Sequence, residues 1–542
     1  MAPARPWFLE TVIYGIQVSA FADANGDGLG DLDGITEHLD YLASLGVGCL
    51  WLTPTYVSGE RDNGYDVIDH RRIDERWGGD AGLDRLIDAA GRRGLRVVLE
   101  LVPNHTSDQH PWFLAGRHGR DAPERSRYLW AREPADDGIR PAFPGPETSV
   151  WSYDELTDEW YRHLFYSFEP DLNVDDPTVR REFSSIVRDL AARGVAGFRV
   201  DCAAPMVNRP NRRRGDDGPL RHLKRHAEEL DPPVALMAEA DVPPEEYHWF
   251  FGKGDEMDLV LDFYLAEELF LALARHSADL IRRGLSRLHP PRPGTGYVNF
   301  LRNLDELSLA RLADDERDDV VAAFDGEPTS FIYERGLRRR VASMLRGDRR
   351  WLELAWSLLF AMPGVPLLAY GDEIGLGDDL SKPERWSVRT AMQWTGGRAG
   401  GFSKAPPDRI VRPPRPDGPW GYRRLNVAAQ ERDRNSFLAW FRGLIRARCS
   451  TPELGWAAWR VVDPGRASVS ALIYEAERGH IGVFHNLADE AVEVLVPEEL
   501  RDGEIETVFP VAPDGRGRPP RRLGERFELP ALGYRWVRTV AG

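Results

Sequence analysis

The chain alternates between short, almost wholly apolar stretches and longer segments whose apolar residues recur at helical spacing. Apolar stretches of this kind are typical of parallel strands that are buried on both faces. One intervening segment, residues 35–45, places leucines at 39, 42 and 45 on one helical face. The pattern predicts strands at residues 12–18, 49–54, 95–102, 197–201, 234–239, 258–262, 297–303 and 365–370. Eight strands with helices between them predict a (β/α)₈ TIM barrel of the α/β class.

The strand–helix alternation is interrupted once and then ends. Residues 106–175 are rich in Pro, Trp, Tyr, Asp and Arg and contain no long periodic run, which favours a functional excursion from the barrel. Beyond residue 452 the pattern changes to short alternating stretches with Gly- and Pro-rich turns, which predict antiparallel strands. We therefore expect a barrel formed by residues 1–105 and 176–452, an inserted domain at 106–175 and a C-terminal antiparallel β-domain at 453–542. The Arg-, Gly- and Asp-rich residues 208–218 predict a mobile loop near the barrel mouth.

Composition and charge narrow the class of protein. A chain of 542 residues with 42% hydrophobic residues is long enough for two or three domains. A formal net charge of −17 argues against binding to nucleic acid or to an anionic membrane, although solubility alone also explains it. The three cysteines show neither metal-ligand spacing nor a disulfide framework. The N-terminus lacks the apolar core of a signal peptide, and the most apolar window, residues 354–370, is broken by proline and glycine. These features predict a soluble cytoplasmic protein.

Acidic residues follow three of the predicted strands. Asp201, Glu239 and Asp305 would all project into the C-terminal mouth of the barrel, where enzymes of this fold place catalytic groups. Arg199 lies two residues before Asp201, on the same face of the strand, and would keep that carboxylate ionised. Two carboxylates about 5 Å apart suit a retaining glycosidase, in which one attacks the anomeric carbon and the other transfers protons. The alternative is that these acids are helix caps and that Arg199–Asp201 is a structural pair.

The loop after the first strand carries a run of alternating oxygen ligands. Asp23, Asn25, Asp27 and Asp31 can converge on one hard cation, and the intervening glycines allow a tight turn. Position twelve of an EF-hand would fall on Gly34, where a glutamate is needed. The sequence thus predicts either a structural calcium site outside an EF-hand or a plain acidic turn.

Four motifs carry a resemblance to a known family. Residues 102–105 (VPNH), 197–201 (GFRVD), 239–241 (EAD) and 299–305 (NFLRNLD) resemble the four signature regions of the α-amylase family. The resemblance implies a barrel with domain B inserted after strand three and a C-terminal β-domain. By the motifs it implies that Asp201 is the nucleophile, Glu239 the acid/base and Asp305 the transition-state stabiliser. His105, Arg199 and Asn303 would then bind the same sugar.

Further motifs resemble the trehalose synthase and oligo-1,6-glucosidase branch of that family. They are residues 62–65 (DNGY), 169–173 (EPDLN) and 389–394 (RTAMQW). The resemblance implies that Asp62 and Arg389 bridge and close the site behind one glucose, and that Tyr65 stacks on its ring. It also implies a structural Ca²⁺, with ligands from Asp23, Asn25, Asp27, Leu29 and Asp31.

One position departs from the family pattern. Leu304 stands where the fourth region normally has a histidine that donates a hydrogen bond to the reacting sugar. Losing such a bond typically costs about 2–4 kcal/mol of transition-state stabilisation. Leu304 therefore implies either a slow enzyme or a different sugar in its subsite.

The resemblance implies a reaction on a small α-glucoside, a disaccharide. The first expectation is an intramolecular transglycosylase resembling trehalose synthase, which isomerises maltose and trehalose through a glucosyl-Asp201 intermediate. The second is an exo-acting α-glucosidase with the same machinery and a wetter acceptor site. A non-catalytic binding protein is the third, but such chains usually lose the carboxylates that are present here.

Overall fold

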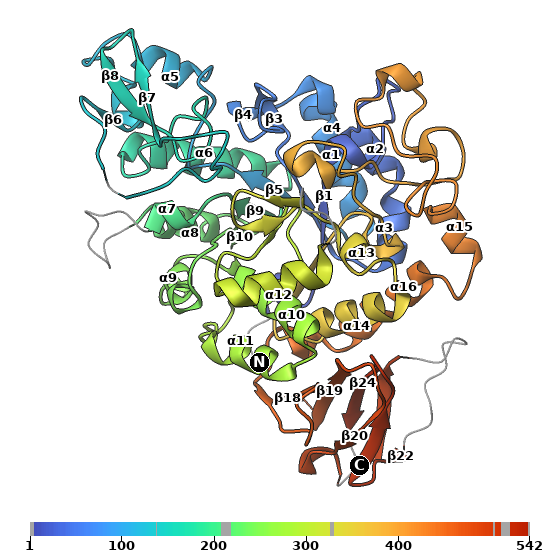
Figure 1. Cartoon of the computed structure of the whole chain (residues 1–542). Coiled ribbons are helices and arrows are strands. Elements are labelled where there is room, and N and C mark those ends of the chain that lie inside the picture. Colours follow the sequence, from blue (N-terminus) through green and yellow to red (C-terminus); the bar gives the residue numbers. More distant parts are fainter. Residues whose placement is uncertain are drawn as a thin grey trace.

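The computed structural model describes residues 5–136, 138–207, 218–325, 330–477, 479–501, 504–510 and 521–539. Eight parallel strands close into a barrel in the spatial order β1, β16, β12, β11, β10, β9, β5 and β2 (Figure 1). They are β1 (Ile13–Ile16), β2 (Cys49–Leu52), β5 (Arg96–Leu101), β9 (Gly197–Val200), β10 (Ala235–Ala238), β11 (Leu259–Leu261), β12 (Gly296–Asn299) and β16 (Val365–Ala369). Each overlaps one of the eight predicted strands, so the barrel prediction is confirmed. All but the first residue of β5 are buried, as expected for strands covered on both faces.

Helices connect the strands and cover the barrel. They include α1 (Val18–Phe21), α2 (Leu32–Glu37), α3 (Leu39–Leu45), α4 (Gly79–Gly91), α6 (Pro177–Ala192), α7 (Ala204–Val207), α8 (Pro219–Glu228), α9 (His248–Phe251), α10 (Phe263–Arg275), α11 (Ala278–Arg287), α12 (Asp314–Phe324), α13 (Val341–Met344) and α14 (Arg349–Phe360). Side-chain caps set several of their starts; the carboxylate of Asp176, for example, accepts a hydrogen bond from the backbone N–H of Thr178. The helix predicted at residues 35–45 is in fact two helices, because the backbone leaves the helical conformation at His38.

The inserted domain follows β5. It contains α5 (Pro111–Gly116) and a small antiparallel sheet of β6 (Trp130–Ala131), β8 (Glu159–Arg162) and β7 (Trp151–Asp154). A bridge between His105 and Asp171 brings its two ends together at the barrel. Packed aromatic rings hold the sheet on α5; Phe113, for instance, stacks on Trp130 with ring centroids 5.4 Å apart. In Figure 1 this domain lies at the opposite end of the molecule from the C-terminal sheet.

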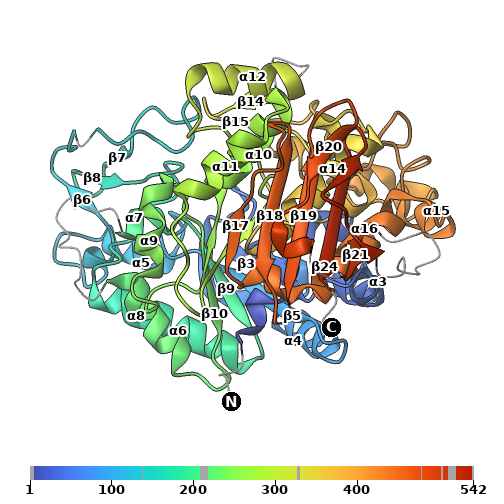
Figure 2. The ribbon, with the colours of Figure 1, turned by 90° about the horizontal axis from the view of Figure 1, so that it is seen from below.

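The C-terminal domain is an antiparallel sheet. Its strands, in spatial order, are β17 (Trp459–Val461), β18 (Val469–Glu475), β19 (His480–Asn486), β24 (Tyr534–Thr539), β21 (Glu504–Phe509) and β22 (Arg521–Arg522). Alternate residues face opposite sides: Leu472 and Tyr474 join the core of the barrel, whereas Ala471 and Ile473 join a second core under the two-stranded sheet of β20 (Val492–Leu495) and β23 (Arg526–Leu529). Seen from below, the sheet lies across the barrel next to α14 and α16 (Phe437–Ser450) (Figure 2). Trp536 Nε1 donates a hydrogen bond to Ser357 Oγ of α14 at 3.1 Å.

Short elements at the barrel mouth support the loops that carry polar side chains. They are the hairpin β3 (Tyr56–Ser58) and β4 (Val67–Ile73), the small sheet β13 (Leu307–Ser308), β15 (Gly336–Leu337) and β14 (Phe331–Ile332), and α15 (Val427–Arg432). Between β16 and α15, where the structure describes every residue, the only regular elements are short 3₁₀ turns. The loop predicted at residues 208–218 lies outside the described residues, except for Gly218. Within the described residues, every helix is too short or too polar to cross a membrane.

Candidate active site

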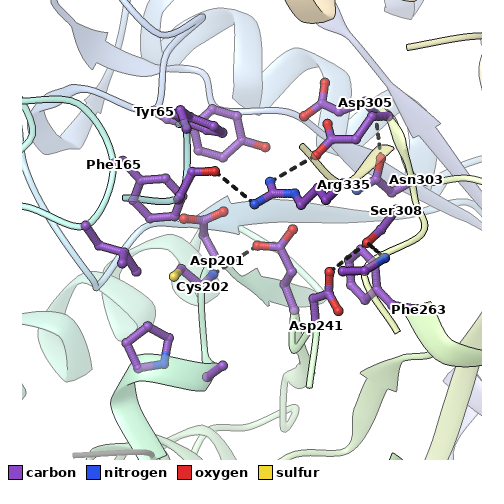
Figure 3. Close-up of a pocket in the computed structure, with 18 of the residues that line it drawn as sticks. Tyr65, Phe165, Asp201, Cys202, Asp241, Phe263, Asn303, Asp305, Ser308 and Arg335 are labelled. Carbon is purple, nitrogen blue, oxygen red and sulfur yellow. Dashed lines mark hydrogen bonds and ion pairs between the residues drawn. The ribbon is translucent and has the colours of Figure 1, made fainter. Parts of the chain in front are cut away.

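A cavity of about 340 Å³ lies between the C-terminal ends of the barrel strands and the inserted domain. This volume is within the range of about 300–1,000 Å³ that is typical of small-molecule sites. Figure 3 shows the side chains converging on it from separate loops and strand ends. Eight of the residues predicted from the sequence line this cavity: Asp62, Tyr65, His105, Arg199, Asp201, Glu239, Asn303 and Asp305.

The guanidinium group of Arg199 lies at the base of the acidic cluster. Its Nη1 is 2.6 Å from Asp201 Oδ1, and it also forms ion pairs with Glu100 and Glu239. Glu100 was not predicted as a site residue; it lies beside Arg199 in the register of β5 and β9 and is fully buried. The signal in the sequence was an acid within an otherwise apolar strand. One cation therefore serves three carboxylates, so the cluster favours retention of a proton.

The three carboxyl groups of this cluster hold protons more strongly than usual. Burial raises the pKa of Glu100 well above its usual range, although Arg199 acts in the opposite direction. Burial, together with the neighbouring charge of Asp201, raises the pKa of Glu239 to about 7, although Arg199 acts in the opposite direction. Burial also raises the pKa of Asp201, against the effect of Arg199. Asp201 and Glu239 also both form ion pairs with the one guanidinium group of Arg199, which brings them close together. Such an arrangement suits a retaining glycosidase, in which the two carboxyl groups lie close to each other.

The turn after β9 helps to fix this pair. Cys202 follows Asp201 with φ at +48°, a conformation that costs a non-glycine residue about 1–3 kcal/mol. In this conformation its backbone N–H donates a hydrogen bond to Glu239 Oε2 at 3.1 Å. The backbone of Cys202, the residue after Asp201, thus orients the carboxyl group of Glu239.

Asp305 has the opposite electrostatic environment. Although burial alone would raise its pKa, the guanidinium groups of Arg389 and Arg385 outweigh that effect and lower the pKa of Asp305 to about 2. Arg389 contacts Asp305 Oδ1 through Nε at 2.8 Å and Nη2 at 2.6 Å, and Arg385 contacts Oδ2 at 3.3 Å. Asp305 is therefore ionised near neutral pH. The site holds a carboxyl group that titrates near neutrality, Glu239, and one that is ionised there, Asp305.

The predicted bridge between Asp62 and Arg389 is replaced by a different pair. Asp62 forms its ion pair with Arg385, while Arg389 binds Asp305. Arg385 lies in the 3₁₀ turn Glu384–Ser387, which directs it into the cavity, whereas Arg389 lies beyond the turn and does not line the cavity. Both arginines are in a segment without hydrophobic periodicity, so the sequence could not show which of them reaches Asp62.

Leu304 does not line the cavity. Strand β12 ends at Asn299, four residues before the predicted end, so residues 303–305 belong to the following loop. Asn303 and Asp305 face the cavity, and the Asp305 N–H donates to Asn303 Oδ1 at 2.7 Å. The methyl groups of Leu304 instead pack toward Gly15 of β1. Both lie within 3.3 Å of the position that a Cβ atom at residue 15 would take. The side chain at this position thus fills space at the rim of the barrel.

Aromatic side chains form the walls of the cavity. Tyr65 is 9% exposed and faces the acidic cluster, and Phe143 and Phe165 enter from the inserted domain (Figure 3). His105 packs edge-on against Phe165 with centroids 5.2 Å apart, and its buried Nε2 has no hydrogen-bond partner among the described residues. The phenylalanines were not predicted, because the inserted segment has no periodic pattern. Unpaired polar atoms between aromatic faces suit a ligand with hydroxyl groups on an otherwise apolar ring.

The loop predicted to bind calcium is compact and closed by its own hydrogen bonds. Asp23 accepts from the backbone N–H groups of Gly26 at 2.6 Å and Gly28 at 2.8 Å, and Asp31 caps α2 through Gly34. Asn25 Nδ2 donates to Asp27 Oδ2 at 3.1 Å. The atoms that the predicted ligands could offer to Ca²⁺ are all oxygens, as this ion requires. No group of three or more His, Cys, Asp or Glu side chains within the described residues is arranged to hold a metal ion, so binding would require these carboxylates to turn away from the backbone.

Comparison with known proteins gives one consistent relationship. The model of the α-amylase catalytic domain matches residues 15–284 and 330–456. Trehalose synthase/amylase TreS of Mycolicibacterium smegmatis is 40% identical over 484 residues, which cover 87% of this chain and 81% of that protein. Glucan 1,6-α-glucosidase of Streptococcus pneumoniae is 28% identical, with coverage of 92% and 95%. The structure of the trehalulose synthase MutB of Pseudomonas mesoacidophila aligns with a TM-score of 0.76 at 25% identity, over 99% of this chain and 100% of that one. Another MutB structure is a complex with isomaltulose.

Proposed function

Because the chain belongs to the α-amylase family and is an enzyme of its glycosidase and transglycosylase class, we propose that it isomerises maltose and trehalose. The reaction is an intramolecular glucosyl transfer through a covalent glucosyl-Asp201 intermediate. The observation that carries this proposal is the arrangement in which Asp201 and Glu239 both pair with Arg199, beside an Asp305 that pairs with Arg385 and Arg389. The 40% identity to a trehalose synthase supports this choice of disaccharides.

The first step breaks the glycosidic bond. A carboxylate oxygen of Asp201 attacks the anomeric carbon of the non-reducing glucose, while Glu239 gives its proton to the departing glycosidic oxygen. The new C–O bond to Asp201 replaces the bond to the second glucose, which leaves as a neutral sugar. Asp305 stabilises the positive charge that develops on the ring. Arg199 supports the ionised form of Asp201 before the attack.

The second step reverses these roles. Glu239, now ionised, removes the proton from the anomeric hydroxyl group of the retained glucose, and that oxygen attacks the anomeric carbon as Asp201 leaves. Two successive displacements restore the α configuration and form trehalose from maltose. The second glucose must turn within the cavity between the two steps. Transfer therefore depends on keeping this sugar in and water out.

Closure of the cavity favours transfer over hydrolysis. The ion pairs of Arg385 with Asp62 and Asp305 close one side of the site, and Phe143 and Phe165 of the inserted domain cover another. Arg335 joins this wall by donating to Ala142 O at 2.9 Å and Glu306 Oε1 at 3.0 Å (Figure 3). These contacts support retention of the released glucose.

The experiment that tests the proposal is incubation of the purified protein with maltose and, separately, with trehalose, followed by NMR of the anomeric protons. Appearance of trehalose from maltose, and of maltose from trehalose, is the expected result. Glucose as the only product from both substrates would overturn isomerisation in favour of hydrolysis. Turnover of neither sugar, with other α-glucosides turned over, would show that the substrate is a different one.

The second candidate is an exo-acting α-glucosidase that hydrolyses a small α-glucoside. The similarity to glucan 1,6-α-glucosidase over 92% of the chain favours it, since hydrolysis uses the same carboxylates with water as the acceptor. The MutB complex with isomaltulose supports a disaccharide ligand in either case. Product ratios from isomaltulose and maltose distinguish the two candidates in the same NMR experiment.

The loop at residues 23–31 supplies a further part of the proposal. Oxygen atoms of Asp23, Asn25, Asp27, Leu29 and Asp31 would hold one structural Ca²⁺, which would fix this loop against the rest of the barrel. The contact of Asp23 with Ser403 places the loop beside the segment that carries Arg385 and Arg389. We also propose a cytoplasmic location, which the three free thiols of Cys49, Cys202 and Cys449 support.

A further inference from the structure

A second cavity, of about 170 Å³, lies behind Arg389. It is formed by the segment between β16 and α15, and Val411, Pro413 and Arg415 are exposed at its edge. Arg389 belongs to its lining, while Asp305, which Arg389 binds, belongs to the lining of the active site. The side chain of Arg389 thus links the lining of the second cavity to a carboxylate of the active site.

Two buried arginines that line this second cavity have guanidinium nitrogen atoms without a hydrogen-bond partner in the described part of the chain. Nε and Nη2 of Arg389 bind Asp305, but its Nη1 is buried without a hydrogen-bond partner among the described residues. Nε of Arg412 is likewise buried and unpaired, although its Nη1 and Nη2 donate to Arg389 O at 3.2 Å and Asn63 Oδ1 at 3.0 Å. Arg389 and Arg412 are 2% and 8% exposed, so water satisfies these donors poorly from outside.

Arg412 forms no ion pair with a carboxylate of the described residues, although Glu60 and Asp305 attract its charge from farther away. Its guanidinium group lies 4.0 Å from the ring centre of Trp386 and otherwise contacts neutral oxygens and the cation Arg389. Burial and the charge of Arg389 lower the pKa of Arg412 to about 10. An unpaired buried cation is costly unless an anion binds beside it.

The acids near this cavity are already occupied. Asp378 binds Arg339 at 3.0 Å and the backbone N–H of Arg340 at 2.8 Å. Asp379 binds Arg415 and the hydroxyl group of Ser381. Gln393 adds one buried oxygen atom without a partner among the described residues, which suits a hydroxyl group on the ligand. The unpaired nitrogen atoms of Arg389 and Arg412 suit an oxyanion, and the unpaired oxygen atom of Gln393 suits a hydroxyl group on the same ligand.

We propose that this second cavity binds a phosphate group, free or on a small sugar, beside the guanidinium groups of Arg389 and Arg412. Guanidinium groups with paired donors suit phosphate oxygens particularly well. The volume of about 170 Å³, half that of the active site, accommodates a phosphate group with at most one sugar ring. A bound anion competes with Asp305 for the charge of Arg389, so phosphate lowers the activity of the neighbouring site.

The first test is calorimetric titration of the full chain at pH 7 and constant ionic strength with inorganic phosphate, glucose 6-phosphate and glucose. Saturable binding of phosphate is expected, and saturating glucose, which occupies the active site under the proposed function, should leave that binding unchanged. Tighter binding of glucose 6-phosphate than of phosphate would identify a sugar phosphate as the ligand; equal binding would identify free phosphate. Competition between phosphate and glucose for one site, or no phosphate binding up to about 10 mM, a dissociation constant that already corresponds to very weak binding, would overturn the proposal.

Arg412→Gln tests the assignment of the site. Loss of a charge-assisted hydrogen bond should weaken phosphate binding at least about tenfold. Arg424→Gln is the matched control, because Arg424 is exposed on the same segment and does not line the cavity. Unchanged binding in Arg412→Gln would overturn the assignment. Should this variant fail to fold, Lys382→Gln at the cavity edge gives a second measurement, with weaker phosphate binding expected and unchanged binding contradicting the site.

The effect on activity rests on the proposed function and is measured separately. Saturating phosphate should lower kcat/KM for an α-glucoside about fivefold, a typical coupling between two sites, and Arg412→Gln should lose this inhibition. Binding without inhibition would overturn the coupling. Absence of any α-glucoside turnover would overturn the proposed function but not phosphate binding, because calorimetry requires no turnover.

Discussion

The guanidinium group of Arg385 pairs with the carboxylate of Asp62 and joins the segment after β16 to the loop between β3 and β4. Both side chains line the active-site cavity, and each is at least 90% buried. Arg385 also reaches Asp305, so one cation links a wall of the cavity to the catalytic cluster. This relationship makes the ratio of transfer to hydrolysis depend on a residue that does not take part in bond breaking.

Arg385→Gln should therefore change the products more than the bond-breaking step. Removing one partner of a buried ion pair opens the wall and leaves Asp62 unpaired, at a cost of about 3–5 kcal/mol. We expect the KM for maltose to rise at least about tenfold and the proportion of free glucose to increase. NMR of the product mixture measures both. Arg311→Gln, which changes the same charge at a more exposed position of the lining, is the control; an equal change in the two variants would contradict a special role for Arg385.

Asp201→Asn should abolish the turnover of α-glucosides, with kcat lower by at least about 10³-fold, since an amide oxygen is a poor nucleophile. Asp241→Asn is the matched control: this carboxylate also lines the cavity but is held by Ser308 and Arg311, and its loss should reduce kcat far less. Steady-state kinetics with maltose and an aryl α-glucoside provide the measurement. Substantial turnover by Asp201→Asn would exclude this residue as the nucleophile.

The pH dependence should show the titration of Glu239. This residue acts as an acid only when protonated, and burial raises its pKa to about 7, so kcat/KM should be high below pH 7 and fall about tenfold per unit above it. Asp305, with its pKa near 2, should contribute no change between pH 4 and pH 9. In Glu239→Gln, an aryl α-glucoside whose leaving group needs no proton should still react and should show no alkaline decrease. An alkaline decrease that persists in this variant would assign the pKa to another group.

Leu304→His should lower stability without raising activity. The side chain at this position packs toward Gly15 and is 7% exposed, so ring nitrogens would be buried in an apolar contact at a cost of about 1–3 kcal/mol. Leu304→Met preserves volume and polarity and should cost less than about 1.5 kcal/mol. Thermal unfolding and the initial rate with maltose compare the three proteins. A faster Leu304→His enzyme would show that residue 304 reaches the sugar after all.

Removal of calcium should lower thermal stability. A cation at 100 times its dissociation constant adds about 2.7 kcal/mol to the free energy of unfolding, so a chelator should reduce Tm measurably. Asp27→Ala should lose this response, because Asp27 is an exposed side chain of the proposed ligand set. Asp33→Ala, in α2 just beyond the loop, should retain it. Equal Tm with calcium and with chelator in the unmodified protein would show that the loop is closed by its own hydrogen bonds.

The barrel was predictable because parallel strands that are buried on both faces consist of almost unbroken runs of apolar residues. The pattern of β2, with four buried residues in succession, has few other interpretations. The ends of the strands were harder to predict. Strand β12 ends at Asn299, where its pairing to β16 stops, but nothing in the sequence marks this point. The break between α2 and α3 was missed because leucines on either side of His38 keep the same helical face.

The acidic centre of the site was predictable for a related reason. Asp201 and Glu239 directly follow strands, so their positions follow from the topology. Residues from loops were different: Arg385 and Arg389 are four residues apart, and only tertiary packing determines that the first reaches Asp62 and the second Asp305. Phe165 enters from a segment whose conformation depends on contacts with the barrel.

The shared core of the C-terminal sheet has a consequence for how the molecule evolves. Trp536 and Tyr474 lie in the same continuous apolar interior as the barrel, and the Tyr474 hydroxyl group donates to Ala361 O at 2.6 Å. The side of the sheet that faces the barrel therefore has no interior separate from it, and removing the sheet would expose apolar side chains of the barrel helices. Replacing this sheet would thus require matching changes in the helices against which it packs.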